Sequence, residues 1–143
     1  MGSYPYAEPE TEKLLREFAM AKGFNAWLNF ELLAAGQGQI EIRQTVSDDM
    51  LQHHGFVHGG VVGALADTAC SWAAATLAGD VVTSSYTIQL LAPALAPTLL
   101  VRAQLIKKTR RNASVEAKVY CLAEDGTERL VANALASIAI VQS

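Results

Sequence analysis

The sequence predicts an α+β domain in which a curved antiparallel β-sheet wraps around one long α-helix. Residues 59–78 are rich in alanine and show neither the alternation nor the β-branched density of a strand, so we expect one long helix there. Four strand-like segments follow, at 81–91, 98–107, 113–121 and 129–141. A weakly polar helix and an antiparallel sheet bury their apolar surfaces best when the sheet curls round the helix. Because one face of the sheet is then left over, packing alone favours an oligomer.

The N-terminal part of the chain is expected to add a short helix and a hairpin. Residues 1–9 contain two prolines and no periodic pattern, so they are expected to form a flexible tail before a single domain at 10–143. Apolar residues then recur at helical spacing, with Thr11 as the expected cap and Gly23 as the stop. Segments 27–33 and 39–46 flank a Gly-Gln-Gly turn and are expected to pair as strands.

Size, charge and cysteine content limit the class of protein. A chain of 143 residues falls within the range of one domain, and a net charge of −3 disfavours nucleic-acid binding. Cys70 and Cys121 form no CxxC pair and no leader-like segment is evident, so we expect a reduced, cytoplasmic protein. Residues 61–78 are apolar, but a carboxylate in the membrane would cost roughly 2.5–3.5 kcal/mol. The Asp67 side chain therefore argues against a membrane span.

Asp67 is the candidate reactive group. It is the one formally charged side chain within residues 56–79, and charged groups in apolar surroundings cluster where function requires them. Its expected helix face carries only small residues, namely Gly60, Gly63, Ala64, Cys70, Ser71 and Ala74. The alternative is a solvated or structurally paired aspartate. Such a residue usually has charged neighbours, and Asp67 has none nearby in the sequence.

Gly59 and Gly60 open the predicted helix, where the first N–H groups lack intrahelical acceptors. Such N–H groups stabilise negative charge that develops on a carbonyl oxygen during acyl transfer. Glycines before a helix can also be purely structural. Eight residues of helix separate Gly59 from Asp67 by about 12 Å, too far for one chain to place both on one carbonyl. We therefore expect two protomers with antiparallel helices and two shared sites in a dimer.

The segment QHHGFVHGGVVGALADTA, residues 52–69, resembles the HGG signature of hotdog-fold acyl-CoA thioesterases of the PaaI-like (phenylacetic acid degradation) family. The resemblance extends from about residue 25 to the end of the chain. It implies a curved antiparallel sheet wrapped around one central helix, a homodimer with shared sites and a dimer of dimers.

The resemblance also assigns roles to single residues. Asp67 would attack the thioester or activate water, and the N–H of Gly59 on the other subunit would bind the oxyanion. Gln52 would orient the thioester or water through its amide, and His58 would support the loop or polarise the carbonyl. Ser85 and Ser71 fall where some relatives hold the water with a hydroxyl.

A basic cluster departs from the family pattern. Many relatives have a Gly-Arg turn near residue 109, whereas here the glycine is absent and the segment is more basic, with Lys107, Lys108, Arg110 and Arg111. The cluster is either a solvated strand end or a grip for the phosphates of coenzyme A. His53 and His54 match no metal-binding spacing and no functional position, and Cys70 has no evident base.

Together these observations predict a thioester hydrolase acting on an aromatic or short- or medium-chain acyl-CoA. No metal or other cofactor is expected, since coenzyme A is part of the substrate. Phe56, Trp72 and Tyr86 are either pocket or core residues. The alternatives are a hotdog hydratase or dehydratase, which would need a His/carboxylate pair, and a noncatalytic acyl-CoA binding module, which would not need Asp67. The sequence leaves open nucleophilic against general-base catalysis and dimer against tetramer.

Overall fold

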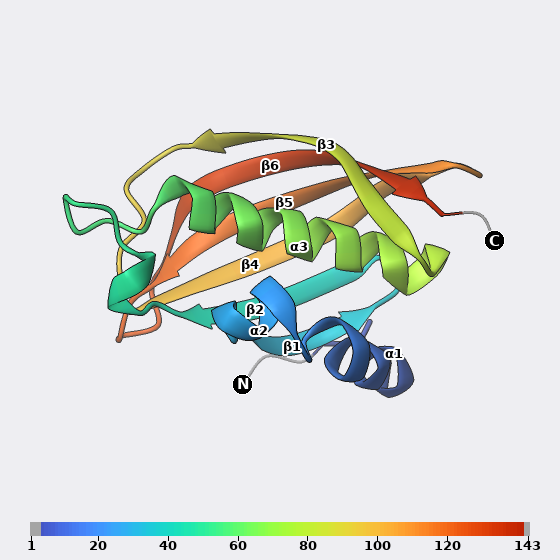
Figure 1. Cartoon of the computed structure of the whole chain (residues 1–143), viewed down its shortest axis with the longest axis horizontal. Helices are drawn as coiled ribbons and strands as arrows, with labels where there is room; N and C mark the ends of the chain where they lie inside the picture. The colour runs from blue at the N-terminus through green and yellow to red at the C-terminus, as the bar shows by residue number, and fades with distance from the viewer. Residues whose placement is uncertain (1–3, 142–143) are drawn as a thin grey trace.

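The computed structural model describes residues 4–141 as one antiparallel sheet wrapped around a long helix (Figure 1), which confirms the predicted fold class. The six strands are ordered β1-β2-β4-β5-β6-β3. The elements are α1 (Pro9–Leu14), a π-turn (Leu15–Ala19), α2 (Gly23–Leu28), β1 (Glu31–Gly36), β2 (Gln39–Thr45), a 3-10 turn (Asp48–Met50), α3 (Gly59–Ala78), β3 (Val81–Leu90), β4 (Thr98–Lys108), β5 (Asn112–Leu122) and β6 (Glu128–Ile140).

Helix α3 has the bounds that the sequence predicts, and it lies in the concave face of the sheet (Figure 1). Its buried side chains are mostly small, which lets the helix approach the strands closely; the buried residues are Val62, Gly63, Leu65, Ala66, Ala69, Cys70, Trp72, Ala73 and Ala74. By length and composition alone α3 is apolar enough to cross a membrane, but 56% of this stretch is buried within the fold. This is the pattern of a core helix.

The strands alternate between the core and the outer face of the sheet. On β5, Val115, Ala117 and Val119 are fully buried toward α3, whereas Glu116 and Lys118 between them lie on the convex face and form an ion pair. The alternation that the sequence shows for this strand therefore separates the two faces of the sheet.

Strand β3 contains a bulge that changes which residues face α3. Val81 and Thr83 pair with Ile140 and Ile138, and the register then shifts so that Ser85 pairs with Ser137. Directly opposed residues of an antiparallel pair lie on the same face. Since Ile138 is buried against α3, the face of Thr83 is the helix side, and Ser85 lies on the opposite side.

The N-terminal segment differs from the expected flexible tail. Among residues 4–8, which the structure describes, Tyr4 donates a 2.5 Å hydrogen bond to Glu41 and the N–H of Glu8 donates to the carbonyl of Ala35 at 2.9 Å. The segment is held there because it satisfies polar groups of the edge strand β1 and the neighbouring β2. Residues 1–3 lie outside the described residues.

The first helix and the first strand also have different bounds from those predicted. The short N-terminal helix is present, but it begins at Pro9 rather than behind Thr11, because proline suits the first helical position. Gly23 does not stop this helix; with a φ of 72° it is the first residue of a second one, α2. Strand β1 therefore starts at Glu31, after Asn29 ends α2 in the left-handed conformation.

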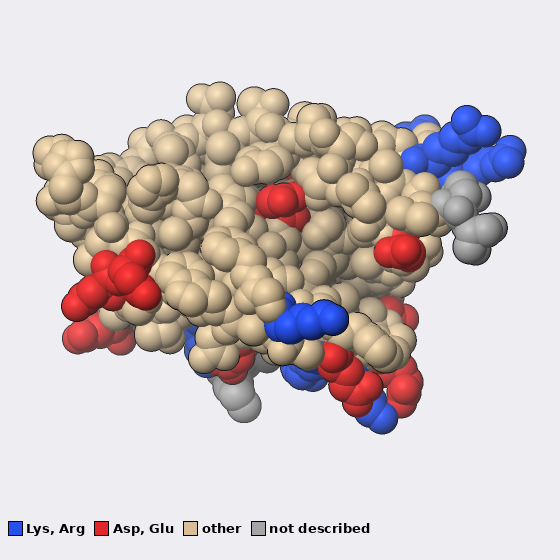
Figure 2. Space-filling model, viewed as in Figure 1, with Lys and Arg blue, Asp and Glu red and all other residues tan. Residues whose placement is uncertain are grey.

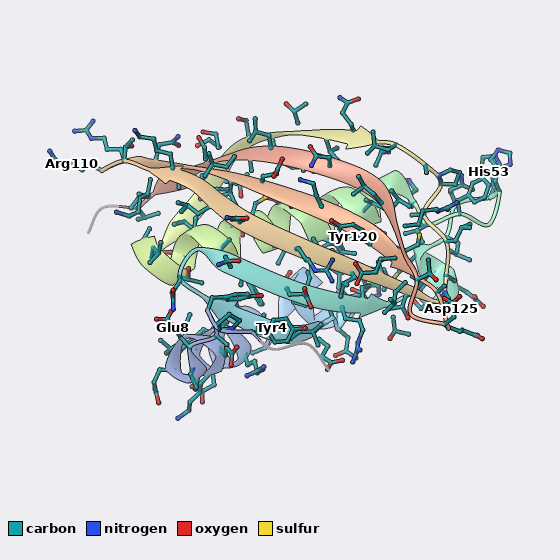
Figure 3. All side chains as sticks on the ribbon, turned by 180° about the vertical axis from the view of Figure 1, so that it is seen from behind. Tyr4, Glu8, His53, Arg110, Tyr120 and Asp125 are labelled. Atoms are coloured by element: carbon teal, nitrogen blue, oxygen red, sulfur yellow. The ribbon has the colours of Figure 1, made fainter. Side chains whose placement is uncertain are left out.

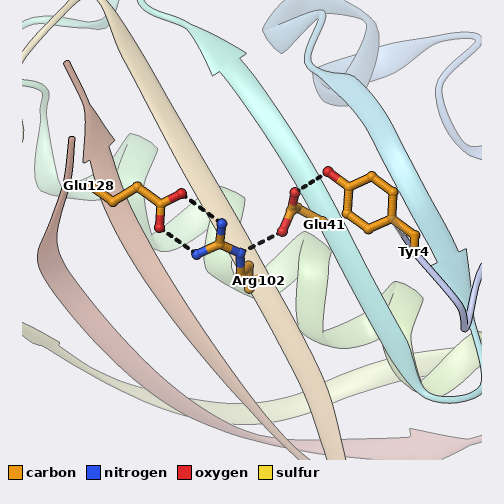
Figure 4. Close-up of polar contacts among 4 residues, drawn as sticks. All are labelled: Tyr4, Glu41, Arg102 and Glu128. Carbon is orange, nitrogen blue, oxygen red and sulfur yellow. Dashed lines mark hydrogen bonds and ion pairs between the residues drawn. The ribbon is translucent and has the colours of Figure 1, made fainter. Parts of the chain in front are cut away.

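A polar network holds the convex face of the sheet (Figure 4). The Arg102 guanidinium donates two hydrogen bonds to Glu128, at 2.7 and 2.8 Å, and one to the buried Glu41 at 2.5 Å. It also stacks over the ring of Tyr120. The bonds to Glu128 and then to Glu41 raise the pKa of Arg102, and the Arg102 bonds lower the pKa of Glu128. Burial together with the Glu41 bond raises the pKa of Tyr4 to about 12.

The network lines a hollow of about 700 Å³ on this face. Its basic side chains are Arg43, Arg102 and Lys118, and each makes an ion pair with a carboxylate of the same face.

We expect the Glu128–Arg102 pair to stabilise the fold only above acidic pH. The Arg102 hydrogen bonds depress the folded-state pKa of Glu128 below its ordinary value of 4.5. The pair therefore stabilises fully above that unfolded-state value and loses its effect as the pH falls through the lowered folded-state value. Urea unfolding of wild type and Glu128→Gln from pH 7 to pH 3 should show a difference that shrinks toward acid. The exposed Glu124→Gln control should show none; a gap constant with pH would contradict the assignment.

Candidate active site

The start of α3 leaves one backbone donor unused. The Nδ1 atom of His58 accepts a 2.8 Å hydrogen bond from the N–H of Gly60, and the His58 carbonyl accepts from Val61 and Val62. Within the part of the chain that the structure describes, the N–H of Gly59 has no acceptor. It is thus the first-turn donor that remains available at the positive end of the helix dipole.

The His58 cap explains the second glycine of the motif. A Cβ atom built on Gly60 would lie 2.9 Å from the His58 Nδ1, so a side chain there would disturb the cap. The His58 side chain therefore contacts the start of its own helix. The N–H of Gly60, the second glycine donor at the predicted helix start, is occupied by this cap.

Gln52 lies beside Gly59 at an apolar hollow of about 340 Å³. The Gln52 side-chain oxygen accepts from the N–H of His54, which leaves the Gln52 amide nitrogen without an acceptor among the described residues. Apolar side chains make up most of the remaining lining; they are Phe56, Val57, Val62, Leu90, Leu91, Ala92, Pro93, Ala94 and Val131. The structure therefore brings two of the predicted polar groups together at the mouth of an apolar pocket.

Asp67 lies half-buried in the middle of α3, and its one hydrogen bond with the described residues comes from β3. The Thr83 hydroxyl donates to the Asp67 Oδ1 at 2.7 Å. No lysine or arginine in residues 4–141 forms an ion pair with this carboxylate. The Asp67 carboxylate is thus oriented by a neutral donor rather than neutralised by a cation.

Cys70, one turn further along α3, is not equipped as a nucleophile. Burial, and then the nearby charge of Asp67, raise the pKa of its thiol to about 12. The thiol is therefore protonated at neutral pH, and it contacts the Val115 carbonyl. This agrees with the sequence, which offers no base for Cys70.

The two serines that the sequence predicts to hold a water do not occupy the position of Thr83, which hydrogen-bonds to Asp67. Ser85 pairs with Ser137 on the face away from α3, and the Ser71 hydroxyl donates to the Thr68 carbonyl within its own helix. Thr83, which sequence reasoning missed, contacts the carboxylate instead. The register shift between Thr83 and Ser85 explains the exchange, because it reverses the facing of every residue beyond it.

The basic cluster and the Gly59 end of α3 lie at opposite ends of one chain. Figure 3 shows Arg110 at one end and His53, from the loop before α3, at the other. Lys107, Lys108 and Arg111 are exposed and form no ion pair with residues 4–141. Within one chain, the basic cluster predicted to bind phosphates therefore does not lie beside the Gly59 N–H predicted to bind the oxyanion.

The face over α3 and β3 is almost uncharged around an isolated acidic group, whereas charged side chains gather along its rims (Figure 2). Large apolar side chains are exposed along β3, with Val82 at 59% and Leu90 at 57%. Strand β3 is also an edge of the sheet. An apolar, unpaired edge beside the carboxylate is the surface on which another chain would pair.

Comparisons with known proteins define the class. The model of the thioesterase superfamily matches residues 54–127, just over half of the chain, and the protein belongs to this superfamily. No curated protein matches the sequence.

Solved structures show the same hotdog fold. A thioesterase family protein from Silicibacter pomeroyi is 26% identical, with 93% of this chain and 99% of that chain covered and a TM-score of 0.86. The E. coli PaaI protein of the phenylacetic acid degradation operon is 21% identical over 94% and 96%, with a TM-score of 0.83. The smu.793 protein from Streptococcus mutans, solved with acetyl CoA, is 24% identical over 85% and 94%, with a TM-score of 0.73.

We expect His58→Ala to weaken the start of α3. Loss of the Nδ1 acceptor leaves the N–H of Gly60 unpaired, and loss of an N-cap costs about 1 kcal/mol. His58→Asn, which keeps an acceptor, should recover most of the free energy of unfolding measured by urea titration. Equal stability of His58→Ala and wild type would show that the cap contributes nothing.

Proposed function

We propose that this protein hydrolyses the thioester of an acyl-CoA to the free acid and coenzyme A. The observation that carries the proposal is the presence, on one helix, of the Gly59 N–H and the Asp67 carboxylate, for which residues 4–141 supply no acceptor and no cationic partner respectively. An acyl transfer needs these two functions, namely a donor for the developing oxyanion and a base or nucleophile. Membership of the thioesterase superfamily supports the same reaction.

In the proposed reaction the Gly59 N–H polarises the thioester carbonyl. By the general-base route, Asp67 takes a proton from water while the water oxygen bonds to the carbonyl carbon. The carbon–sulfur bond then breaks, and the proton passes to the departing thiolate. By the nucleophilic route, an Asp67 oxygen bonds to the carbon, and the carbon–sulfur bond breaks as the thiolate of coenzyme A leaves. Water then cleaves the resulting anhydride, which frees the acid, restores the Asp67 carboxylate and supplies the proton for the thiolate. Neither route needs a cofactor.

The two groups come from different protomers in this proposal. About 12 Å of helix separates them along one chain, so antiparallel α3 helices of two chains are needed to place both on one carbonyl. The uncharged face over α3 and the unpaired β3 edge support a dimer built there. The sheet's convex face remains for contact between dimers.

The hollow beside Gly59 supports an acyl group of limited size. About 340 Å³ with a lining that is mostly apolar suits an aromatic ring or a short to medium chain. Of the three aromatic side chains raised from the sequence, Phe56 lines this hollow, whereas Trp72 packs against Phe30 in the core with ring centroids 5.2 Å apart. The Tyr86 hydroxyl lies near Gly63 of α3.

The basic cluster is proposed to bind the phosphates of coenzyme A. Its side chains are exposed and cationic, and antiparallel helices would bring one protomer's cluster toward the Gly59 end of its partner. The Streptococcus mutans neighbour was solved with acetyl CoA, which supports acyl-CoA as the ligand class.

The direct test is thiol release from a panel of aromatic, short-chain and medium-chain acyl-CoAs. We expect wild type to release thiol and Asp67→Asn to lose at least about 10²-fold in rate, since general-base catalysis alone contributes that much. Circular dichroism should show both proteins folded. Hydration of an enoyl-CoA without thiol release would favour the hydratase, and binding without turnover the binding module. A folded, fully active Asp67→Asn would refute the mechanism.

A mixture of two inactive variants tests the shared site. Gly59→Pro removes the N–H at a position that tolerates proline, since His58 before it is extended with ψ of 134°. Co-expression with Asp67→Asn should restore about a quarter of wild-type activity, because half of the dimers are mixed and each carries one intact site.

Gly59→Ala is the matched control, because it keeps the N–H while adding a similar contact with Leu90. It should remain active alone. Failure of the mixed dimers to recover activity would place both groups within one chain.

Removing charge from the cluster should weaken binding of the nucleotide part of the substrate. We expect the combined variant Lys107→Gln, Lys108→Gln and Arg111→Gln to raise KM for an acyl-CoA by on the order of tenfold, about 1.4 kcal/mol. The same acyl group on pantetheine, which lacks the phosphates, should show unchanged KM. A similar rise for both substrates would contradict phosphate binding.

A further inference from the structure

We propose that Thr83 is the positioning residue for Asp67: it holds one oxygen of the carboxylate so that the other faces the reacting atoms. This inference rests on the proposed thioester hydrolysis and assigns a role to a residue that the sequence motif does not include. It is carried by the 2.7 Å hydrogen bond from the Thr83 hydroxyl to the Asp67 Oδ1.

The direction of this hydrogen bond is fixed by chemistry. An ionised carboxylate only accepts, so the threonine hydroxyl must donate. Threonine is β-branched, and its χ1 angle is restricted in a strand, so the hydroxyl is held stiffly toward the helix. Both side chains are half-buried, which limits competition from water. The donor is therefore preorganised by the backbone of β3.

The bulge of β3 makes Thr83 the last serine or threonine of its strand to face the carboxylate. Thr83 pairs with the buried Ile138, and the register shift follows directly after it. Ser85 and Thr87 then pair with Ser137 and Leu135 on the outer face. The strand thus offers Asp67 one inward threonine hydroxyl and turns Ser85 and Thr87 away. The Tyr86 hydroxyl, which also faces the helix, lies beside Gly63.

The Thr83 contact gives the two carboxylate oxygens of Asp67 different roles. Oδ1 is occupied by Thr83, whereas Oδ2 makes no hydrogen bond with the described residues. A carboxylate free to rotate would present either oxygen, and a donor on one of them removes that freedom.

Few other titratable groups face Asp67 from the packed elements. On α3 the neighbour is Cys70, whose thiol stays protonated near neutral pH, and on β3 Tyr86 faces the helix beside Gly63. No described lysine, arginine or histidine forms an ion pair with the carboxylate. Among the described residues, the Thr83 hydroxyl is therefore the side-chain donor on which the orientation of the Asp67 carboxylate depends.

The test compares Thr83→Val with Thr83→Ser on the full-length protein. Valine keeps the shape and removes the donor, whereas serine keeps it. We expect Thr83→Val to lower kcat by on the order of tenfold with little change in KM, the loss of one hydrogen bond. Thr83→Ser should restore kcat, and Thr87→Val, on the outer face, should change neither kcat nor KM.

Each outcome decides between the roles. An active wild type together with an unchanged kcat in folded Thr83→Val would overturn the positioning role alone. A wild type that cleaves no thioester would overturn the proposed function and this role together. If Thr83→Val does not fold, Thr83→Ala and Thr83→Ser carry the same comparison; equal loss in both would show a role in packing rather than donation.

Discussion

The close approach of α3 to the concave sheet is the constraint on which the rest of the structure depends. Alanines 66, 69, 73 and 74 are fully buried, so the helix contacts the strands through methyl groups rather than through long side chains. Such a contact fixes the depth and rotation of the helix tightly, because close-packed interiors tolerate little change in volume. The rotation that buries these alanines is the one that leaves Asp67 half-buried beside the β3 edge.

The same geometry creates the need for a partner. A single straight helix can carry the carboxylate in its middle and a free N–H at its start, but it cannot fold back to bring them together. The proposed dimer resolves this separation by supplying each function from a different chain. Strand β3 is central to that arrangement, since its inner side orients Asp67 and its edge remains open for pairing.

How far the sequence predicts the structure depends on whether the signal is local. The bounds of α3 follow from its composition. The Gly-Gln-Gly turn is predicted from its glycines, and the structure has φ values above zero there at Gln37 and Gly38. The docking of residues 4–8 depends on distant partners such as Glu41, which no local pattern reveals. Thr83 was missed because strict alternation along a strand places it and Ser85 on the same face. The inward-facing residues change from odd to even numbers between Val81 and Tyr86, and this change was the available sign of a bulge.

The saturated charges of the convex face have a consequence for ligand selectivity. The hollow there is larger than the one beside Gly59, and it is lined by three cations. Each of these cations already pairs with a carboxylate of the same face, so a polyphosphate arriving from solution would have to compete with those carboxylates for them. The pairing thus lessens the competition of this larger hollow with the proposed site for the anionic coenzyme A part of the substrate.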